Sequence, residues 1–108
     1  MATRLSVSTD DRNDGTLVLS AAGDIDLSNI DVFTRALQGA AGSGKTVTVD
    51  LSDVEYVYSG AINALFDNVD HIALIIAHPF LIPALTVSGL TQLASVQRNP
   101  PAKQSDTG

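Results

Sequence analysis

The chain has 108 residues, no cysteine, and 12 acidic against 6 basic side chains, which gives a net charge of −6. This length allows one domain, large enough to fold without a disulfide or a metal. The lack of cysteine excludes thiolate metal sites and cysteine nucleophiles, and it agrees with a reducing compartment. The basic residues are few and scattered, so nucleic-acid binding, which requires clustered lysine and arginine, is not expected.

No secretory or membrane-spanning segment is expected from the chain. Its first ten residues lack the apolar run of a signal peptide. The most apolar stretch, 72–87, is shorter than the roughly 18–20 residues of a transmembrane helix. His78, Pro79 and Pro83 also interrupt it. We therefore expect a soluble, cytoplasmic protein without direct membrane insertion.

The N-terminal part of the chain predicts a β-hairpin. Leu5 and Val7 alternate with polar residues, and the apolar pattern resumes at 17–19. The loop between them ends in Asn13-Asp14-Gly15, a sequence typical of tight turns. We expect these two strands to form an antiparallel edge of a larger sheet.

An amphipathic helix is predicted after the hairpin. Four apolar residues recur at helical spacing, namely Ile30, Phe33, Leu37 and Ala40. Ser28 is expected to cap the N-terminus of this helix, with Asp31 as the carboxylate of a capping box. The glycines at 39, 42 and 44 are expected to end it.

The remaining segments alternate strands with helices. Buried strands are predicted at 47–51 and 73–77, and helices from Gly60 to about Val69 and over 80–87. This alternation indicates an α/β fold, a mixed sheet of about four to five strands with helices packed on it. We assign residues 1–96 to this domain. The segment 97–108 is polar and contains two prolines, so we expect a disordered tail there.

Residues 39–46, Gly-Ala-Ala-Gly-Ser-Gly-Lys-Thr, match the phosphate-loop pattern GxxxxGK[ST]. That motif requires a strand before the loop and a helix after it, so that backbone N–H groups face the anion. Here a helix precedes the loop and a strand follows, and the helix end beside the loop repels phosphate. Glycines that end a helix explain the same letters. We favour this interpretation over nucleotide binding.

Three segments carry a resemblance to a known family: Asp50 to Leu65 (DLSDVEYVYSGAINAL), Gly23-Asp24-Ile25-Asp26, and Ser88-Gly89-Leu90. In this order they resemble the signature of the STAS family, the bacterial anti-sigma factor antagonists, over about residues 4 to 96. The resemblance implies the STAS-type fold. It also implies a protein that binds an anti-sigma factor, itself a serine protein kinase, and so regulates sigma-factor-dependent transcription.

The resemblance implies site residues as well. The phosphorylated serine of such antagonists falls on Ser59, and the aspartate of the first motif falls on Asp26. The implied partner surface comprises Asp24, Asp26, Ser28, Tyr58, Ser59, Gly60, Ala61 and Ile62. We expect the Ser59 hydroxyl to cap the N–H of Ala61 or Ile62. A phosphate there adds roughly −1.5 to −2 charge and would disrupt a docked partner.

Two positions depart from the family pattern. Tyr58 stands where aspartate is usual, and Ala61 stands where glycine is usual. The second helix is also about two turns shorter than is typical. These departures leave open a member that is not phosphorylated, or a chain that is shortened on the side that faces the partner. The alternative function is that of a STAS regulatory module in a membrane transport assembly.

Other chemistry is not expected from the remaining polar and aromatic residues. His71 and His78 lack companion ligands at metal-binding spacing. The acidic residues lack a nucleophile–base pair, so we expect no enzyme activity and no cofactor. Tyr56 is expected to serve in packing, at a rim, or as an interface anchor. We expect a monomer or a weak dimer.

Overall fold

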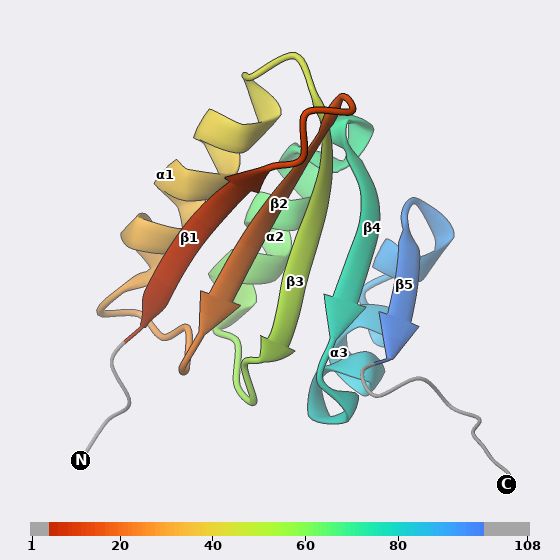
Figure 1. The fold of residues 1–108 in the computed structure, drawn as a ribbon. Coiled ribbons are helices and arrows are strands. Elements are labelled where there is room, and N and C mark those ends of the chain that lie inside the picture. Colours follow the sequence, from red (N-terminus) through yellow and green to blue (C-terminus); the bar gives the residue numbers. More distant parts are fainter. Residues whose placement is uncertain (1–4, 99–108) are drawn as a thin grey trace, which may run out of the picture.

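The computed structural model describes residues 5–98 of the protein. Five strands form one sheet in the order β1 (Ser6–Asp11), β2 (Thr16–Ala22), β3 (Thr46–Asp53), β4 (Ile72–Ala77) and β5 (Ser95–Arg98). The helices are α1 (Ile30–Ala41), α2 (Ser59–Asp67) and α3 (Ile82–Val87), with 3-10 turns at Val69–His71, Pro79–Leu81 and Leu90–Gln92. Figure 1 shows the helices behind the sheet, on the same side of it.

The sheet is mixed, as predicted. β1 and β2 pair antiparallel, while β2, β3, β4 and β5 run parallel to one another. The predicted hairpin is thus confirmed as an antiparallel edge, and its turn uses Gly15 at a φ of +90°, which glycine adopts readily. Because β2, β3 and β4 are parallel, the segments that follow them meet at one edge. We call this the C-terminal edge, and it consists of residues 23–29, 54–58 and 78–81.

One apolar core lies between the sheet and the helices. In β3, buried Val47, Val49 and Leu51 alternate with polar residues, because successive side chains of a strand point to opposite faces. In β4 the outward positions Leu74 and Ile76 are apolar and partly exposed. The largest fully buried side chains are Phe33, Leu19, Ile25, Leu37, Leu51, Leu65, Ile75, Leu85, Leu90, Val47, Val49 and Val54. Phe33 and Leu37 of the predicted helical stripe are among them. None of the helices within residues 5–98 combines the length and apolar composition needed to cross a bilayer.

The boundaries of α1 differ from the prediction. The helix begins at Ile30 and its N-cap is Asn29, so the prediction of Ser28 as cap is wrong. No side chain makes a capping hydrogen bond there, and the proposed capping box with Asp31 is absent. The Ser28 hydroxyl instead donates to Asp26 Oδ1 at 2.5 Å. Gly39 lies inside the helix, which ends before Gly42.

The C-terminal part of the fold also differs in detail. The predicted helix over 80–87 is divided into the turn Pro79–Leu81 and α3, in whose first turn Pro83 is tolerated. β5 includes Gln97 and Arg98, two residues that we assigned to the tail. The rest of the expected tail lies outside the described residues, as do positions 1–4 of the expected domain. Only Val96 of β5 packs against the core, so the strand carries little apolar pattern.

Candidate protein-binding site

The segments that follow β2 and β3 are joined by backbone hydrogen bonds. Ile25 N–H donates to the Tyr56 carbonyl at 3.0 Å, and Tyr58 N–H donates to the Ile25 carbonyl at 2.7 Å. These bonds form an isolated parallel bridge between Ile25 and Val57. The Ile25 side chain is fully buried beneath it. The bridge therefore holds the turn at 24–29 beside the residues that lead into α2.

Side chains of Asp26 and Asn29 close the turn at 24–29. Asn29 Nδ2 donates to the Asp24 carbonyl and Asn29 Oδ1 accepts the Asp26 N–H, both at 2.9 Å. Asp26 Oδ1 accepts the N–H of Ser28 at 2.9 Å as well as its hydroxyl. The Ser28 hydroxyl bond holds the pKa of Asp26 below its ordinary value, so this carboxylate is charged at neutral pH. The turn is thus a preorganised acidic corner.

Ser59 is the first residue of α2, and it is exposed. The N-cap is Tyr58, whose carbonyl accepts the Ala61 N–H at 2.8 Å. No side chain caps this helix, so the prediction that the Ser59 hydroxyl caps Ala61 or Ile62 is wrong. The hydroxyl therefore contributes nothing to the cap and lies at the positive end of the α2 dipole, where negative charge is favoured.

The ring of Tyr58 packs on Gly60. A Cβ built at Gly60 would lie 3.0 Å from Tyr58 Cε2 and 3.1 Å from Tyr58 Cδ2. It would also lie 3.5 Å from Cγ1 of Ile30 in the first turn of α1. The absence of a side chain at Gly60 thus makes room for the tyrosine ring. The predicted partner residues Tyr58 and Gly60 form one packed unit at the start of α2.

The structure brings most of the predicted partner residues to the C-terminal edge or to the first turn of α2 beside it. Asp24, Asp26 and Ser28 lie on the turn, while Tyr58, Ser59 and Gly60 begin α2 and partly exposed Ile62 follows. Ala61 is the exception, because it is 1% exposed and packs in the core. It cannot contact a partner directly. We call residues 24–28 together with 58–60 the Ser59 corner.

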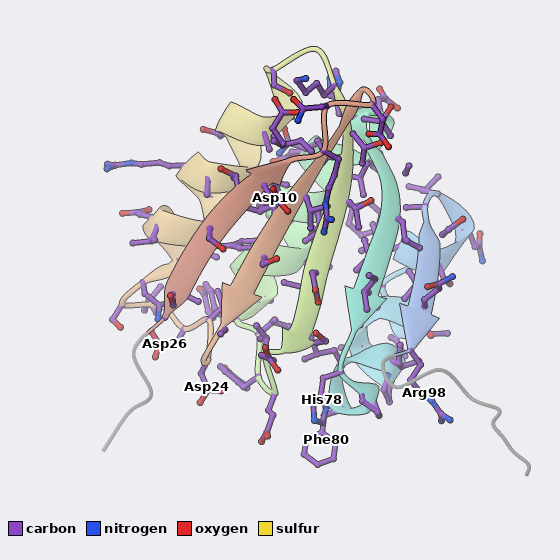
Figure 2. All side chains as sticks on the ribbon, viewed as in Figure 1. Asp10, Asp24, Asp26, His78, Phe80 and Arg98 are labelled. Carbon is purple, nitrogen blue, oxygen red and sulfur yellow. The ribbon has the colours of Figure 1, made fainter. Side chains whose placement is uncertain are left out.

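Sequence reasoning missed two exposed apolar residues at the same edge. Leu27 is 70% exposed and Phe80 is 68% exposed, and both follow the carboxyl end of a parallel strand. Tyr56, which we considered as an anchor, is 53% exposed and lies at the same edge, in the loop between β3 and α2. Figure 2 shows Phe80 and His78 projecting at the same end of the molecule as Asp24 and Asp26. The available signal was that Leu27 falls outside the apolar stripe of α1.

The loop that resembles a phosphate loop lies at the opposite edge of the sheet. The predicted order, a helix before the loop and a strand after it, is confirmed by α1 and β3. Ser43 N–H donates to the Ala40 carbonyl, Lys45 N–H to Ser43 Oγ, and Thr46 N–H to the Gly15 carbonyl. These three donors are therefore not free to hold a phosphate.

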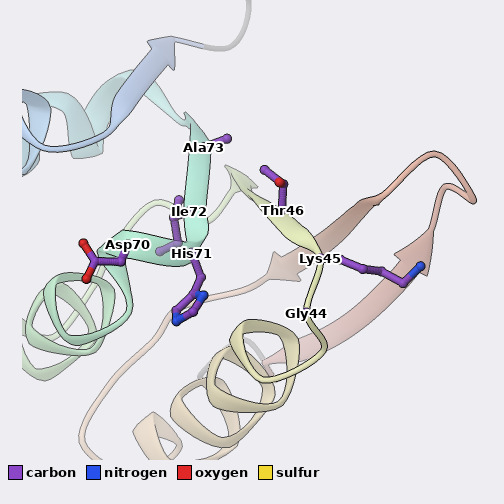
Figure 3. Close-up of a pocket in the computed structure, with 7 residues that line it drawn as sticks. All are labelled: Gly44, Lys45, Thr46, Asp70, His71, Ile72 and Ala73. Atoms are coloured by element: carbon purple, nitrogen blue, oxygen red, sulfur yellow. The ribbon is translucent and has the colours of Figure 1, made fainter.

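An open pocket of about 370 Å³ adjoins this loop, lined by Gly44, Lys45, Thr46, Asp70, His71, Ile72 and Ala73. The Lys45 side chain points away from it (Figure 3), and its Nζ lies 3.2 Å from the carboxylate of Asp11. The pKa of Asp11 is lowered chiefly by the N–H of Asn13 and then by Lys45. Lys45 thus pairs with the hairpin rather than with a ligand. No group of three metal-binding side chains occurs within residues 5–98.

Comparison with known proteins gives one family and several structural neighbours. A family model described as "Mlab, STAS domain" matches residues 8–95. A search of curated proteins finds no match. Among solved structures, an anti-sigma factor antagonist from Mycobacterium paratuberculosis has a TM-score of 0.77 at 20% identity, covering 86% of this chain and 85% of that one.

Two further solved structures are similar in fold. The anti-sigma factor antagonist SpoIIAA in its unphosphorylated form has a TM-score of 0.67 at 13% identity, covering 87% of this chain and 90% of that one. The Bacillus cell fate determinant SpoIIAA in its phosphorylated form has a TM-score of 0.60 at 13% identity, covering 87% of this chain and 93% of that one. At these identities the likeness concerns the fold.

Proposed function

Because the chain belongs to the STAS domain family, we propose that it is an anti-sigma factor antagonist, which binds an anti-sigma factor and thereby frees a sigma factor for transcription. The observation that carries the proposal is the Ser59 corner, where a rigid acidic turn is hydrogen-bonded to the segment that opens α2. Proteins of the same fold that are described as anti-sigma factor antagonists support it. The proposal implies a cytoplasmic location.

The Ser59 corner suits a protein–protein contact because it is already ordered. The side chains of Asp26 and Asn29 hold the turn, and the ring of Tyr58 is seated on Gly60. A surface that is ordered before binding loses little conformational entropy when a partner docks. Asp24 and Asp26 give it negative charge, which favours a partner with basic side chains.

Phosphorylation of Ser59 by the bound anti-sigma factor is the proposed release step. The Ser59 oxygen takes the γ-phosphoryl group of ATP, ADP leaves, and the hydroxyl proton passes to solvent. The phosphate joins a surface whose aspartates are matched by the cations of the partner. It must therefore be desolvated without a counter-charge of its own, which weakens the complex. A phosphorylated form of a protein of this fold supports this step.

The test mixes the purified chain with each anti-sigma factor encoded by the genome that carries it, with and without ATP. We expect one of them to bind with a Kd that calorimetry can measure and to transfer phosphate to Ser59, located by mass spectrometry. Ser59→Glu should weaken binding at least about tenfold. Ser95→Glu, an exposed serine at the opposite edge, is the matched control and should bind like the wild type.

Two results would contradict the proposal in different ways. Stable binding with no phosphate on Ser59 would remove the release step and leave the antagonist. Binding to no anti-sigma factor, together with binding to a purified transporter subunit, would replace the proposal by the regulatory module of a membrane transport assembly. Asp24→Asn combined with Ser59→Glu provides a check on the mechanism. This double variant should bind the anti-sigma factor more tightly than the sum of the two single effects on binding predicts. The cation of the partner that Asp24 no longer matches can then pair with the glutamate at position 59.

A further inference from the structure

We propose that the surface that binds the anti-sigma factor extends from the Ser59 corner to the end of β4, where Phe80 serves as an aromatic anchor. The inference rests on the proposed function and deepens it. The partner that covers this surface is the anti-sigma factor. It presents an apolar pocket, with lysine or arginine at the rim, that receives the Phe80 ring. We call residues 78–80 the Phe80 projection.

Local structure holds Phe80 outward in a fixed turn. Its N–H donates to His78 Nδ1 at 3.0 Å, and the two rings lie with centroids 4.5 Å apart. Pro79 fixes the backbone between them, and the Leu81 N–H donates to the His78 carbonyl at 2.8 Å. Leu81 is 2% exposed and anchors the turn in the core. A large aromatic side chain presented on an ordered turn is the kind of group that dominates binding energy in interfaces.

The Phe80 projection is connected to the Ser59 corner through the β3–α2 loop. The backbone N–H of His78 donates to the Leu51 carbonyl, with 3.4 Å between the nitrogen and the oxygen. The His78 side chain reaches toward the loop, and its Nε2 lies 4.0 Å from Glu55 Oε2. Tyr56 follows Glu55 and accepts the Ile25 N–H at its carbonyl. The exposed side chains of Phe80, Tyr56 and Leu27 therefore follow the carboxyl ends of three neighbouring strands, β4, β3 and β2.

Charge indicates the kind of partner. Carboxylates at or beside this edge come from Asp24, Asp26, Asp53 and Glu55. Arg98, at the end of β5, adds one cation at this end of the molecule, because its backbone is in register with Ala77 (Figure 2). Apolar side chains among carboxylates fit a partner whose apolar pocket carries basic residues at its rim. The opposite edge of the sheet provides a residue for comparison with Phe80. Leu93 is 58% exposed there and lies beside the start of β4.

The experiment compares Phe80→Ser with Leu93→Ser, which removes an apolar side chain of similar exposure from the opposite edge. The probe is the anti-sigma factor that the wild-type chain binds, and the readout is the Kd from calorimetry. We expect Phe80→Ser to raise the Kd at least about tenfold, as loss of an aromatic anchor does. Leu93→Ser should stay within about twofold. Phe80→Tyr, which keeps the ring, should retain the wild-type Kd within about threefold.

Each outcome separates this inference from the proposed function. If the wild type and Phe80→Ser bind the anti-sigma factor equally, the inference is wrong and the proposed function stands. If the wild type binds none, the proposed function is wrong and the inference fails with it. A change in molar mass by light scattering, with an unchanged Kd, would assign Phe80 to self-association and also overturn the inference. Circular dichroism and a thermal melt of each variant verify that the fold is intact.

Discussion

Replacing Gly60 by alanine tests the packing of Tyr58 at the start of α2. Two opposing effects decide the outcome. Alanine reduces the freedom of the unfolded chain and stabilises a compatible helical position by about 0.4–1 kcal/mol. The new Cβ would lie 3.0 Å from Tyr58 Cε2, so the ring must move by a few tenths of an ångström or leave its place. Because Tyr58 is partly exposed, its ring can move, and the two effects are of similar size.

We therefore expect Gly60→Ala to change the free energy of unfolding by less than about 0.5 kcal/mol in the wild-type chain. In a Tyr58→Ala background the obstacle is gone, and the same substitution should stabilise the protein by about 0.4–1 kcal/mol. Urea denaturation of the four proteins in this double-mutant cycle measures the difference as a coupling energy. Equal stabilisation in both backgrounds would show that the ring is not seated on Gly60, and our description of the Ser59 corner would fail.

Three further predictions follow from buried and charged groups. Phe33→Ala removes a fully buried side chain and should lower the free energy of unfolding by about 3–5 kcal/mol in urea denaturation; a loss below about 1 kcal/mol would contradict its place in the core. Asp26 has a lowered pKa, so its stabilising effect is present above the unfolded-state pKa and disappears as pH falls through the folded-state value. Asp26→Ala should therefore have a lower Tm than the wild type at pH 7. At a pH well below the folded-state pKa of Asp26 the two proteins should have the same Tm, and a difference that persists there would refute the role given to the charge. Lys45→Ala should lower the free energy of unfolding only slightly, because its ion pair with Asp11 lies at the surface in contact with solvent. Fluorescence titration should show no ATP binding by either protein, and ATP binding that Lys45→Ala abolishes would restore the phosphate-loop interpretation.

Periodic apolar residues made the main elements predictable. The stripe from Ile30 to Ala40, the alternating β-branched pattern of β3 and the apolar run of β4 are local patterns, and they need no knowledge of the rest of the chain. The cap of α1 was harder, because Ser28 and Asn29 are both favoured caps in adjacent positions. In the structure the Ser28 hydroxyl bonds to Asp26 and the Asn29 side chain bonds back to the turn, so neither side chain caps the helix. That competition depends on the shape of the turn and is not visible in the helical pattern.

The exposure of Phe80 could not be predicted from apolar character alone. Residues 79–85 contain several apolar residues in succession, so any of them can be assigned to the buried face. In the structure Leu81 and Leu85, four residues apart, take the buried face, while Phe80 and Ala84 are exposed. The bridge between Ile25 and Val57 was equally hidden, because it joins residues far apart in the chain.

The negative charge of the chain acquires a local meaning at the Ser59 corner. Asp26 stays charged because Ser28 donates to it, and Asp24 lies two residues before it on the same turn. In the free chain, water screens the repulsion between these carboxylates and a phosphate on Ser59. When a partner docks, water is excluded and the same charges interact more strongly. Under the proposed function, the aspartates that attract a basic partner to the unmodified chain therefore make a chain phosphorylated on Ser59 a poor fit for that partner, because the partner's cations are already matched.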